Sequence, residues 1–241
     1  MNPTAMGPFG SALAAYAAGD ASAEVTVRRD DGHEARLPAS HFFRGEDALT
    51  ELELAALARC AGDVLDIGTA AGSHAQVLQR RGLRVTAIDI SSEAVAIAAN
   101  RGVVDARRAD VMRFAGGPFD TLLMLGHGIG MVETMAGLGA FLTTAESLLV
   151  PGGQLLLDSM DAAATTDPVH LAYHEANRRA GRYIGEIRMQ FEFGGRTGPW
   201  CGWLQVDAAA LGAEAAARGW GCDVIDRSPN GDYLARLATG C

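Results

Sequence analysis

Residues 64 to 73, which read Val-Leu-Asp-Ile-Gly-Thr-Ala-Ala-Gly-Ser, constrain the fold more than any other part of this chain. A short apolar run ends at Gly68, a second glycine follows at Gly72, and a helical pattern begins at once. In this order of strand, tight turn and helix, backbone N–H groups and a helix N-terminus face an open crevice. The next apolar run ends in Asp89, whose carboxylate can accept hydrogen bonds from both hydroxyls of a ribose. The pattern predicts an α/β fold that binds a nucleoside-containing cofactor.

The spacing of the small residues favours S-adenosylmethionine (SAM) over a dinucleotide. The dinucleotide pattern G-x-G-x-x-G would require glycines at the positions of Ala70 and Ser73, and a β-carbon at Ala70 would obstruct a pyrophosphate. The SAM-type pattern, acidic-x-G-x-G-x-G, matches at Asp66, Gly68 and Gly72 and departs at Ala70. Because SAM has no phosphates and carries an amino group, an acidic residue beside the turn is favourable.

Several segments, taken in order, resemble the class I SAM-dependent methyltransferases, and together they cover roughly residues 60 to 160. They are Val64–Ser73, Val85–Ser91, Arg108–Val111, Phe119–Leu125 and Leu148–Asp158. The resemblance implies a doubly wound, mostly parallel seven-stranded sheet, SAM as the cofactor, and methyl transfer as the activity. It does not name the acceptor, because this fold methylates very different substrates.

The resemblance also implies which residues hold SAM. Asp89 occupies the ribose position, and Asp110 occupies the position whose acidic side chain contacts the adenine amino group in such proteins. We expect His74 to line the methionine end of the cofactor. The full set expected at the cofactor is Asp66, Gly68, Thr69, Ala70, Gly72, His74, Asp89, Ile90, Asp110, Val111 and Leu125.

The composition is typical of one soluble globular unit, because 241 residues suit a single α/β domain with additions. No apolar run approaches the ~20 residues of a membrane span, and no Lys or Arg precedes Arg28, so no secretory signal is predicted. The cysteines are scattered without a C-x-x-C pair, which argues against a zinc site or a disulfide framework; they are Cys60, Cys201, Cys222 and Cys241. We expect a cytoplasmic protein that is a monomer or a homodimer.

The net charge of −9 argues against a nucleic-acid substrate, because phosphate neutralisation by basic side chains supplies most of that affinity. The dense basic clusters, Arg107-Arg108 and Arg178-Arg179-Arg182, do not alternate with aromatic residues and are typical of solvated helix faces. We therefore expect a small-molecule substrate, and neither nucleic acid nor membrane as a partner.

Two parts of the chain extend the cofactor-binding core. Residues 1–45 are predicted to form an N-terminal cap, with a short helix from Pro8 to Ala18 and a β-hairpin that turns at Asp31-Gly32. Residues 46–241 form the methyltransferase domain, with an antiparallel hairpin inserted at about residues 182–206. The cap either folds over the cofactor and acceptor or packs against the core as a surface hairpin.

Further elements of the domain follow from local patterns. We expect a helix from Asp47 to Cys60 and a longer helix whose apolar positions run from Met131 to Leu149. Segments 222–226 and 233–237 are predicted to close the sheet as an antiparallel pair.

His127 is the candidate catalytic residue. It lies in the loop Leu125-Gly126-His127-Gly128-Ile129-Gly130, beside the expected position of the methyl group. An imidazole that titrates near neutral pH suits a general base, which is needed only where the acceptor must lose a proton. The alternative is a histidine hydrogen-bonded to the backbone of a tight turn. His170 and His174 either lie near the acceptor or are ordinary surface histidines.

The same loop excludes two kinds of chemistry. It lacks the Asn/Asp-Pro-Pro-Tyr motif of enzymes that methylate exocyclic base amines or glutamine amides. It also lacks the acid that metal-dependent catechol-type enzymes place there, because the chain has Leu125-Gly126. Asp158 and Asp161 follow the fifth strand, but this pair without the first ligand is a weak oxygen site. We expect no metal.

The predicted function is methyl transfer from SAM to an oxygen or nitrogen of a small, partly apolar metabolite. The residues expected at the acceptor are Phe43, Arg44, His127, Tyr183 and Trp203. The aromatic residues of the hairpin could wall an apolar pocket, although tryptophans in a hairpin are more often core. Two alternatives stay open: a peptide or protein acceptor that docks on the hairpin edge, and a SAM-binding protein that performs no methyl transfer.

Overall fold

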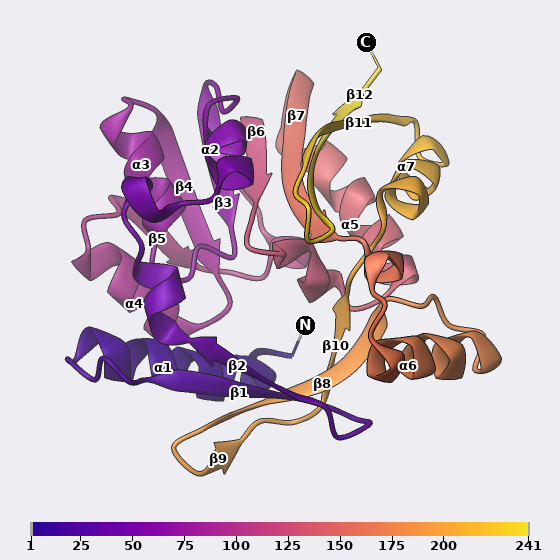
Figure 1. The fold of residues 1–241 in the computed structure, drawn as a ribbon. Helices are drawn as coiled ribbons and strands as arrows, with labels where there is room; N and C mark the ends of the chain where they lie inside the picture. Colours follow the sequence, from indigo (N-terminus) through magenta and orange to yellow (C-terminus); the bar gives the residue numbers. More distant parts are fainter. Residues whose placement is uncertain (1, 241) are drawn as a thin grey trace.

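The larger of two β-sheets organises the structure, a computed structural model that describes residues 2–240 (Figure 1). Its seven strands lie in the order β11-β12-β7-β6-β3-β4-β5. Neighbours from β7 to β5 pair in parallel, whereas β12 pairs antiparallel with both β7 and β11. The bounds are β3 (Asp63–Ile67), β4 (Arg84–Asp89), β5 (Asp105–Arg108), β6 (Phe119–Met124), β7 (Leu149–Met160), β11 (Trp220–Arg227) and β12 (Asp232–Thr239). The predicted mostly parallel seven-stranded sheet and its antiparallel closing pair are confirmed.

Helices cover both faces of this sheet, which makes the fold doubly wound. A hydrophobic core lies on each face of the sheet, and consecutive leucines of β7 alternate between the two. Leu155 and Leu157 pack with α5 and α7, and Leu156 packs with α2 and α3. Strands buried on both faces need such continuous apolar runs. The helices are α2 (Glu51–Leu57), α3 (Ser73–Arg80), α4 (Ser92–Asn100), α5 (Met135–Leu148) and α7 (Ala208–Ala216).

Two helices begin later than the sequence pattern predicts. The helix expected from Asp47 is a short 3-10 turn followed by α2, because Thr50 and Glu53 form a capping box that begins the helix at Glu51. The helix expected from Met131 begins at Met135, because the Thr134 side chain accepts the Gly137 N–H and caps it. The preceding residues, Gly128–Val132, form a short 3-10 helix instead.

The N-terminal hairpin and the inserted hairpin form one sheet, here called the cover sheet. Its order is β10-β8-β1-β2, with β9 beside β8, and β1 pairs antiparallel with β8 from Thr26↔Glu192 to Arg29↔Met189. The bounds are β1 (Glu24–Arg29), β2 (Glu34–Pro38), β8 (Glu186–Phe193), β9 (Arg196–Thr197) and β10 (Cys201–Leu204). Both predicted hairpins are present, and their joining is a feature that the sequence did not reveal. The cover sheet lies across the end of the larger sheet (Figure 1).

Two further helices support the cover sheet. α1 (Gly7–Ala17) packs between β8 and α4, and its Gly10 lies so close to α4 that an added Cβ would be 2.6 Å from Ser91 Oγ. α6 (Pro168–Arg179) follows β7 and was not predicted, because three of its buried residues, Tyr173, His174 and Asn177, do not form an apolar stripe. None of the described helices is long and apolar enough to cross a membrane.

A glycine contact joins the cover sheet to the loop after β6. A Cβ built on Gly130 would lie 2.0 Å from Trp203 Nε1 of β10. A Cβ on Gly202, also in β10, would lie 2.7 Å from Glu133 Cβ. The two segments therefore approach at a distance that only glycine permits, and this contact fixes the Trp203 ring relative to the loop.

We expect Gly130→Ala to lower the free energy of unfolding by about 1–3 kcal/mol, because the new methyl group must displace the Trp203 ring. The matched control is Gly212→Ala in α7, where an added Cβ meets nothing within 4 Å. This control should raise stability by about 0.5–1 kcal/mol, as alanine does inside a helix. Urea unfolding measures both changes, and a Gly130→Ala protein as stable as wild type would contradict the close packing.

Candidate active site

A cavity of about 1100 Å³ lies between the carboxyl ends of the parallel strands and the cover sheet. Ligand pockets usually measure about 300–1,000 Å³, so this one has room for a cofactor and a second small molecule. Val27, Leu37, Met189 and Trp203 of the cover sheet line it. The N-terminal segment thus contributes to the wall of the cavity, through Val27 of β1 and Leu37 of β2. All six histidines of the chain line the cavity, including His170 and His174.

The glycine turn after β3 keeps its shape with alanine in its middle position. Gly68, Ala70 and Gly72 all have left-handed backbone, with φ of 77°, 48° and 80°. This conformation costs a residue with a side chain about 1–2 kcal/mol. The Ala70 N–H donates to Asp89 Oδ2 at 3.0 Å, and this charge-assisted hydrogen bond offsets the strain. Ala70 can thus occupy the position where the SAM-type pattern has glycine.

Asp66 and Gly72 were expected at the cofactor, but they do not line the cavity. Asp66 is 2% exposed and accepts a hydrogen bond of 2.6 Å from Thr69 Oγ1. Burial raises the pKa of Asp66, against the opposing effects of His74 and Thr69. The remaining residues expected at the cofactor do line the cavity; they are Gly68, Thr69, Ala70, His74, Asp89, Ile90, Asp110, Val111 and Leu125.

Asp89 and Asp110, the residues expected at the ribose and the adenine, lie at and just beyond the ends of the adjacent strands β4 and β5. Asp89 accepts the backbone N–H of Ala70 on one oxygen and that of Ser91, at 2.8 Å, on the other. Each oxygen keeps a lone pair for a ligand hydroxyl. Burial raises the pKa of Asp89, although these backbone bonds oppose the rise. Asp110 accepts the Met112 N–H at 3.0 Å, which fixes its carboxylate at the rim of the cavity.

A buried carboxylate that sequence analysis missed, Glu53, holds His74, the residue expected at the methionine end of the cofactor. It accepts hydrogen bonds from Arg44 at 2.7 and 3.0 Å and from the Thr50 N–H at 2.7 Å, and His74 Nε2 lies 2.9 Å away. Burial alone would raise the pKa of Glu53, but His74, Thr50 and Arg44 together hold that pKa well below its usual range. Burial likewise disfavours protonated His74, but Glu53 and Asp66 outweigh it and raise the pKa of His74.

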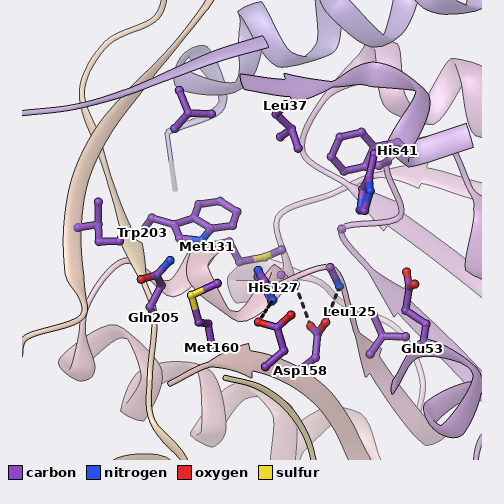
Figure 2. A pocket seen from close by; sticks show the side chains of 18 of the residues that line it. Leu37, His41, Glu53, Leu125, His127, Met131, Asp158, Met160, Trp203 and Gln205 are labelled. Carbon is purple, nitrogen blue, oxygen red and sulfur yellow. Dashed lines mark hydrogen bonds and ion pairs between the residues drawn. The ribbon is translucent and has the colours of Figure 1, made fainter. Parts of the chain in front are cut away.

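His127 lies at the floor of the cavity between two acids (Figure 2). The N–H groups of Gly126 and His127 donate to Asp158 at 3.2 and 2.8 Å, which holds the left-handed backbone of the loop. His127 Nε2 lies 3.1 Å from Asp232 Oδ1. Burial lowers the pKa of His127, but the contact with Asp232 and the charge of Asp158 outweigh it, so the pKa is raised above its ordinary value.

The wall beside His127 is largely apolar. Trp203, Met131 and Met160 surround the space above the His127 ring, and the amide of Gln205 faces the same space (Figure 2). Apolar walls with a few placed polar groups are typical of sites for small molecules. Residues 2–240 bring together no group of three or more histidine, cysteine, aspartate or glutamate side chains that could hold a metal ion. Cys241 lies outside the described residues.

Comparison with known proteins identifies the family. Residues 64–153 match the family model described as a methyltransferase domain. A crystal structure of a SAM-dependent methyltransferase from Bacteroides fragilis, in complex with S-adenosyl-L-homocysteine, is similar over 100% of this chain and 98% of that chain, with 32% identity and a TM-score of 0.86. The chain belongs to the SAM-dependent methyltransferases. The predicted cofactor and enzyme class are confirmed, and the alternative of a SAM-binding protein without methyl transfer falls away.

Curated relatives of this methyltransferase match more locally. The ubiquinone biosynthesis O-methyltransferase of Xanthomonas euvesicatoria pv. vesicatoria is 36% identical over 139 residues, which are 54% of this chain and 54% of that protein. The protein of the same name from Caulobacter sp. is 31% identical over 106 residues, 41% of this chain and 40% of that protein. The match thus spans about half the length of the curated relatives or less.

The residues expected at the acceptor do not all line the cavity. Trp203, His127 and Arg44 line the cavity, but Arg44 is paired with Glu53, which also contacts His74. Phe43 does not line the cavity, because its ring packs on Tyr16, with centroids 4.6 Å apart, and Phe42 takes its place. Tyr183 also lies outside the lining, where its hydroxyl donates to Asp207 at 2.5 Å.

We expect Asp89→Ala in this methyltransferase to weaken SAM binding by about 1.5–3 kcal/mol, the range for hydrogen bonds to a charged group. The matched control is Asp105→Ala on the neighbouring strand β5, whose carboxylate pairs with Arg107 outside the cavity lining. Its affinity for SAM should equal that of wild type. Calorimetry measures both affinities, and an unchanged affinity in Asp89→Ala would overturn the placement of the ribose.

Proposed function

We propose that this methyltransferase transfers the methyl group of SAM to a hydroxyl of a small, partly apolar metabolite, with His127 as general base. The observation that carries the proposal is the position of His127 in the cavity with Nε2 3.1 Å from Asp232 Oδ1. A histidine oriented by a carboxylate is the arrangement by which enzymes remove a proton from a hydroxyl. The two curated relatives are named O-methyltransferases, which supports an oxygen acceptor.

The contacts of His127 assign its two nitrogens different roles. We propose that the neutral ring carries its proton on Nε2, which lies 3.1 Å from Asp232 Oδ1, and has its lone pair on Nδ1. Nδ1 contacts no protein partner among residues 2–240 and is the atom that receives the acceptor's proton. The resulting imidazolium would lie beside Asp232 and Asp158, whose negative charges stabilise it.

The steps balance in protons and charge. SAM, when bound, supplies a methyl group activated by its positive sulfur. The hydroxyl oxygen of the acceptor would form the new O–CH3 bond as the S–CH3 bond of the sulfonium breaks and S-adenosylhomocysteine, with a neutral sulfur, leaves. The hydroxyl proton would pass to His127 Nδ1. The protein aligns the two reactants beneath the cover sheet, and alignment of this kind can supply about 7–11 kcal/mol of the barrier reduction. A general base contributes about 10²–10⁴-fold.

The shape of the site supports a small acceptor. The cover sheet and α6 both contribute lining residues, among them Trp203 and Tyr173, so the cavity has a wall on the side opposite the parallel strands. A folded protein would have to insert an extended segment between this wall and the strands. The apolar wall formed by Trp203, Met131 and Met160 matches a partly apolar molecule.

We expect His127→Ala to lower kcat by about 10²-fold or more while the affinity for SAM stays within twofold of wild type, because all the expected cofactor residues except Leu125 lie on other loops. Turnover is measured as S-adenosylhomocysteine formed with the low-molecular-mass fraction of a cell extract, and SAM affinity by calorimetry. Wild-type turnover in His127→Ala would mean that His127 is an ordinary turn histidine without a catalytic role. Turnover with the protein fraction alone would show a polypeptide acceptor.

The contact with Asp232 gives a pH signature. His127 acts as a base only when it is neutral, so kcat/KM should rise as the pH rises through its pKa, which lies above the ordinary 6.5. Asp232→Asn removes the main interaction that raises this pKa, so the rising limb should move to lower pH and the plateau should fall. Asp223→Asn, an exposed acid of the same hairpin, should leave the profile unchanged. A profile unaltered by Asp232→Asn would contradict the assignment.

A further inference from the structure

The inner face of the cover sheet carries one charged side chain. Directly paired residues of antiparallel strands share a face, so the registers place Val27 and Arg29 of β1 with Ile187, Met189 and Trp203. Among the described residues of β1, β2, β8 and β10, Arg29 is the sole charged residue on this face. The other charged residues of the four strands lie on the outer face, where several form ion pairs, such as Arg28 with Glu34 and Glu192.

Arg29 is 7% exposed and lines the cavity. Its Nε and Nη2 donate to the two oxygens of Asp31 at 2.8 and 2.6 Å, and its Nη1 lies 2.9 Å from His170 Nδ1. The guanidinium stacks on the Tyr173 ring, 4.2 Å from its centroid. A guanidinium has five N–H donors, so one N–H on each terminal nitrogen has no acceptor among residues 2–240.

Two histidines add hydrogen-bond donors at the same place. Arginine can only donate, so His170 Nδ1 must accept, and the neutral ring carries its proton on Nε2. His33 follows the turn after β1, where its carbonyl oxygen accepts the Arg29 N–H at 2.8 Å, and its ring centroid lies 4.9 Å from that of His170. Both rings line the cavity.

The acids next to Arg29 in the chain, Asp30 and Asp31, already accept hydrogen bonds from other side chains. Both Asp31 oxygens bind Arg29, and one of them also accepts the His33 N–H at 3.2 Å. Asp30 accepts the Tyr173 hydroxyl at 2.8 Å. Neither Asp30 nor Asp31 is among the residues that line the cavity, whereas Arg29, His33 and His170 are. An oxyanion at this end of the cavity would therefore find N–H donors.

The cluster lies at the α6 end of the cavity. The cofactor residues line the opposite side, next to α3 and α4, and the His127 loop lies beneath Trp203 (Figures 1 and 2). A molecule whose hydroxyl faces His127 can extend along the apolar wall of Trp203 and Met160 toward Arg29.

We propose that Arg29, His33 and His170 form a subsite for an anionic oxyacid group of the acceptor, a carboxylate or a phosphate, at the end remote from the methylated hydroxyl. The acceptor class is then a small hydroxy acid with an apolar middle. This inference rests on the proposed function, since it takes the chamber beside His127 as the acceptor site. A carboxylate or phosphate can bind two N–H groups of one guanidinium, which gives orientation as well as affinity.

The test is calorimetry on the protein saturated with S-adenosylhomocysteine. The probes are hydroxyphenylacetate, its neutral isostere hydroxyphenylacetamide, and phenyl phosphate. Wild type should bind at least one of the two anions about tenfold or more tightly than the amide. The tighter anion distinguishes a carboxylate from a phosphate. Arg29→Gln should abolish this preference while leaving the affinity for the amide unchanged, and Arg29→Lys should retain part of it.

The matched control is Arg28→Gln, which removes one positive charge from the adjacent position on the outer face. It should keep the full anion preference. His170→Phe, which preserves a ring and removes the donor, gives a second variant and should reduce the preference several-fold. Affinity for S-adenosylhomocysteine, measured in every variant, reports whether the cofactor half is intact.

The proposal is overturned if wild type binds neither anion more tightly than the amide, or if the preference survives Arg29→Gln with cofactor affinity intact. The readout is binding without turnover, so it is independent of the His127 experiment. If wild type prefers the anions but His127→Ala turns over normally, the anion subsite is present and the role of His127 as general base is wrong. If wild type shows no anion preference but His127→Ala still lowers turnover, the subsite proposal fails and the proposed function stands.

Discussion

The pairing of β1 with β8 is the interaction on which the cavity depends. An isolated two-stranded hairpin is marginally stable in water, and each of the two hairpins would be one without this pairing. Joined from Thr26↔Glu192 to Arg29↔Met189, they form a single sheet with one apolar face. That face packs on α1 at one end and roofs the cavity at the other. The glycine contact of Gly130 with Trp203 then ties the roof to the loop that carries His127.

Pairing of cationic side chains with buried or half-buried carboxylates explains how an acidic chain builds a site rich in histidine and arginine. Glu53 holds Arg44 and His74, Asp232 and Asp158 flank His127, and Asp31 holds Arg29. The ion pairs are Arg44–Glu53, His74–Glu53, His127–Asp232 and Arg29–Asp31. Buried charges are tolerated in proteins when they are paired in this way. The proposed acceptor site lies between hydrogen-bonding groups that these pairs leave over, namely Nδ1 of His127 and one N–H on each terminal nitrogen of Arg29.

Local patterns predicted much of this molecule. The turn at Gly68 to Gly72, the acid at Asp89 and the two hairpins each have a signature within a few residues. The pairing of β1 with β8 has none, because it joins segments far apart in the chain and is decided by the complete fold. Glu53, Asp158 and Asp232 were missed as site residues for the same reason, and α6 because its buried residues include polar ones. Phe43 was expected where Phe42 lies, since a pattern locates a loop residue less closely than a helix or strand residue.

The most direct test of this account is a crystal structure of the chain with S-adenosylhomocysteine, because it locates both halves of the cavity at once. We expect the ribose hydroxyls on Asp89, the adenine beside Asp110 and the sulfur facing His127, with the space between His127 and Arg29 still open to a second molecule. A nucleoside bound away from Asp89, or a sulfur turned away from His127 with that space filled by the cofactor, would contradict it.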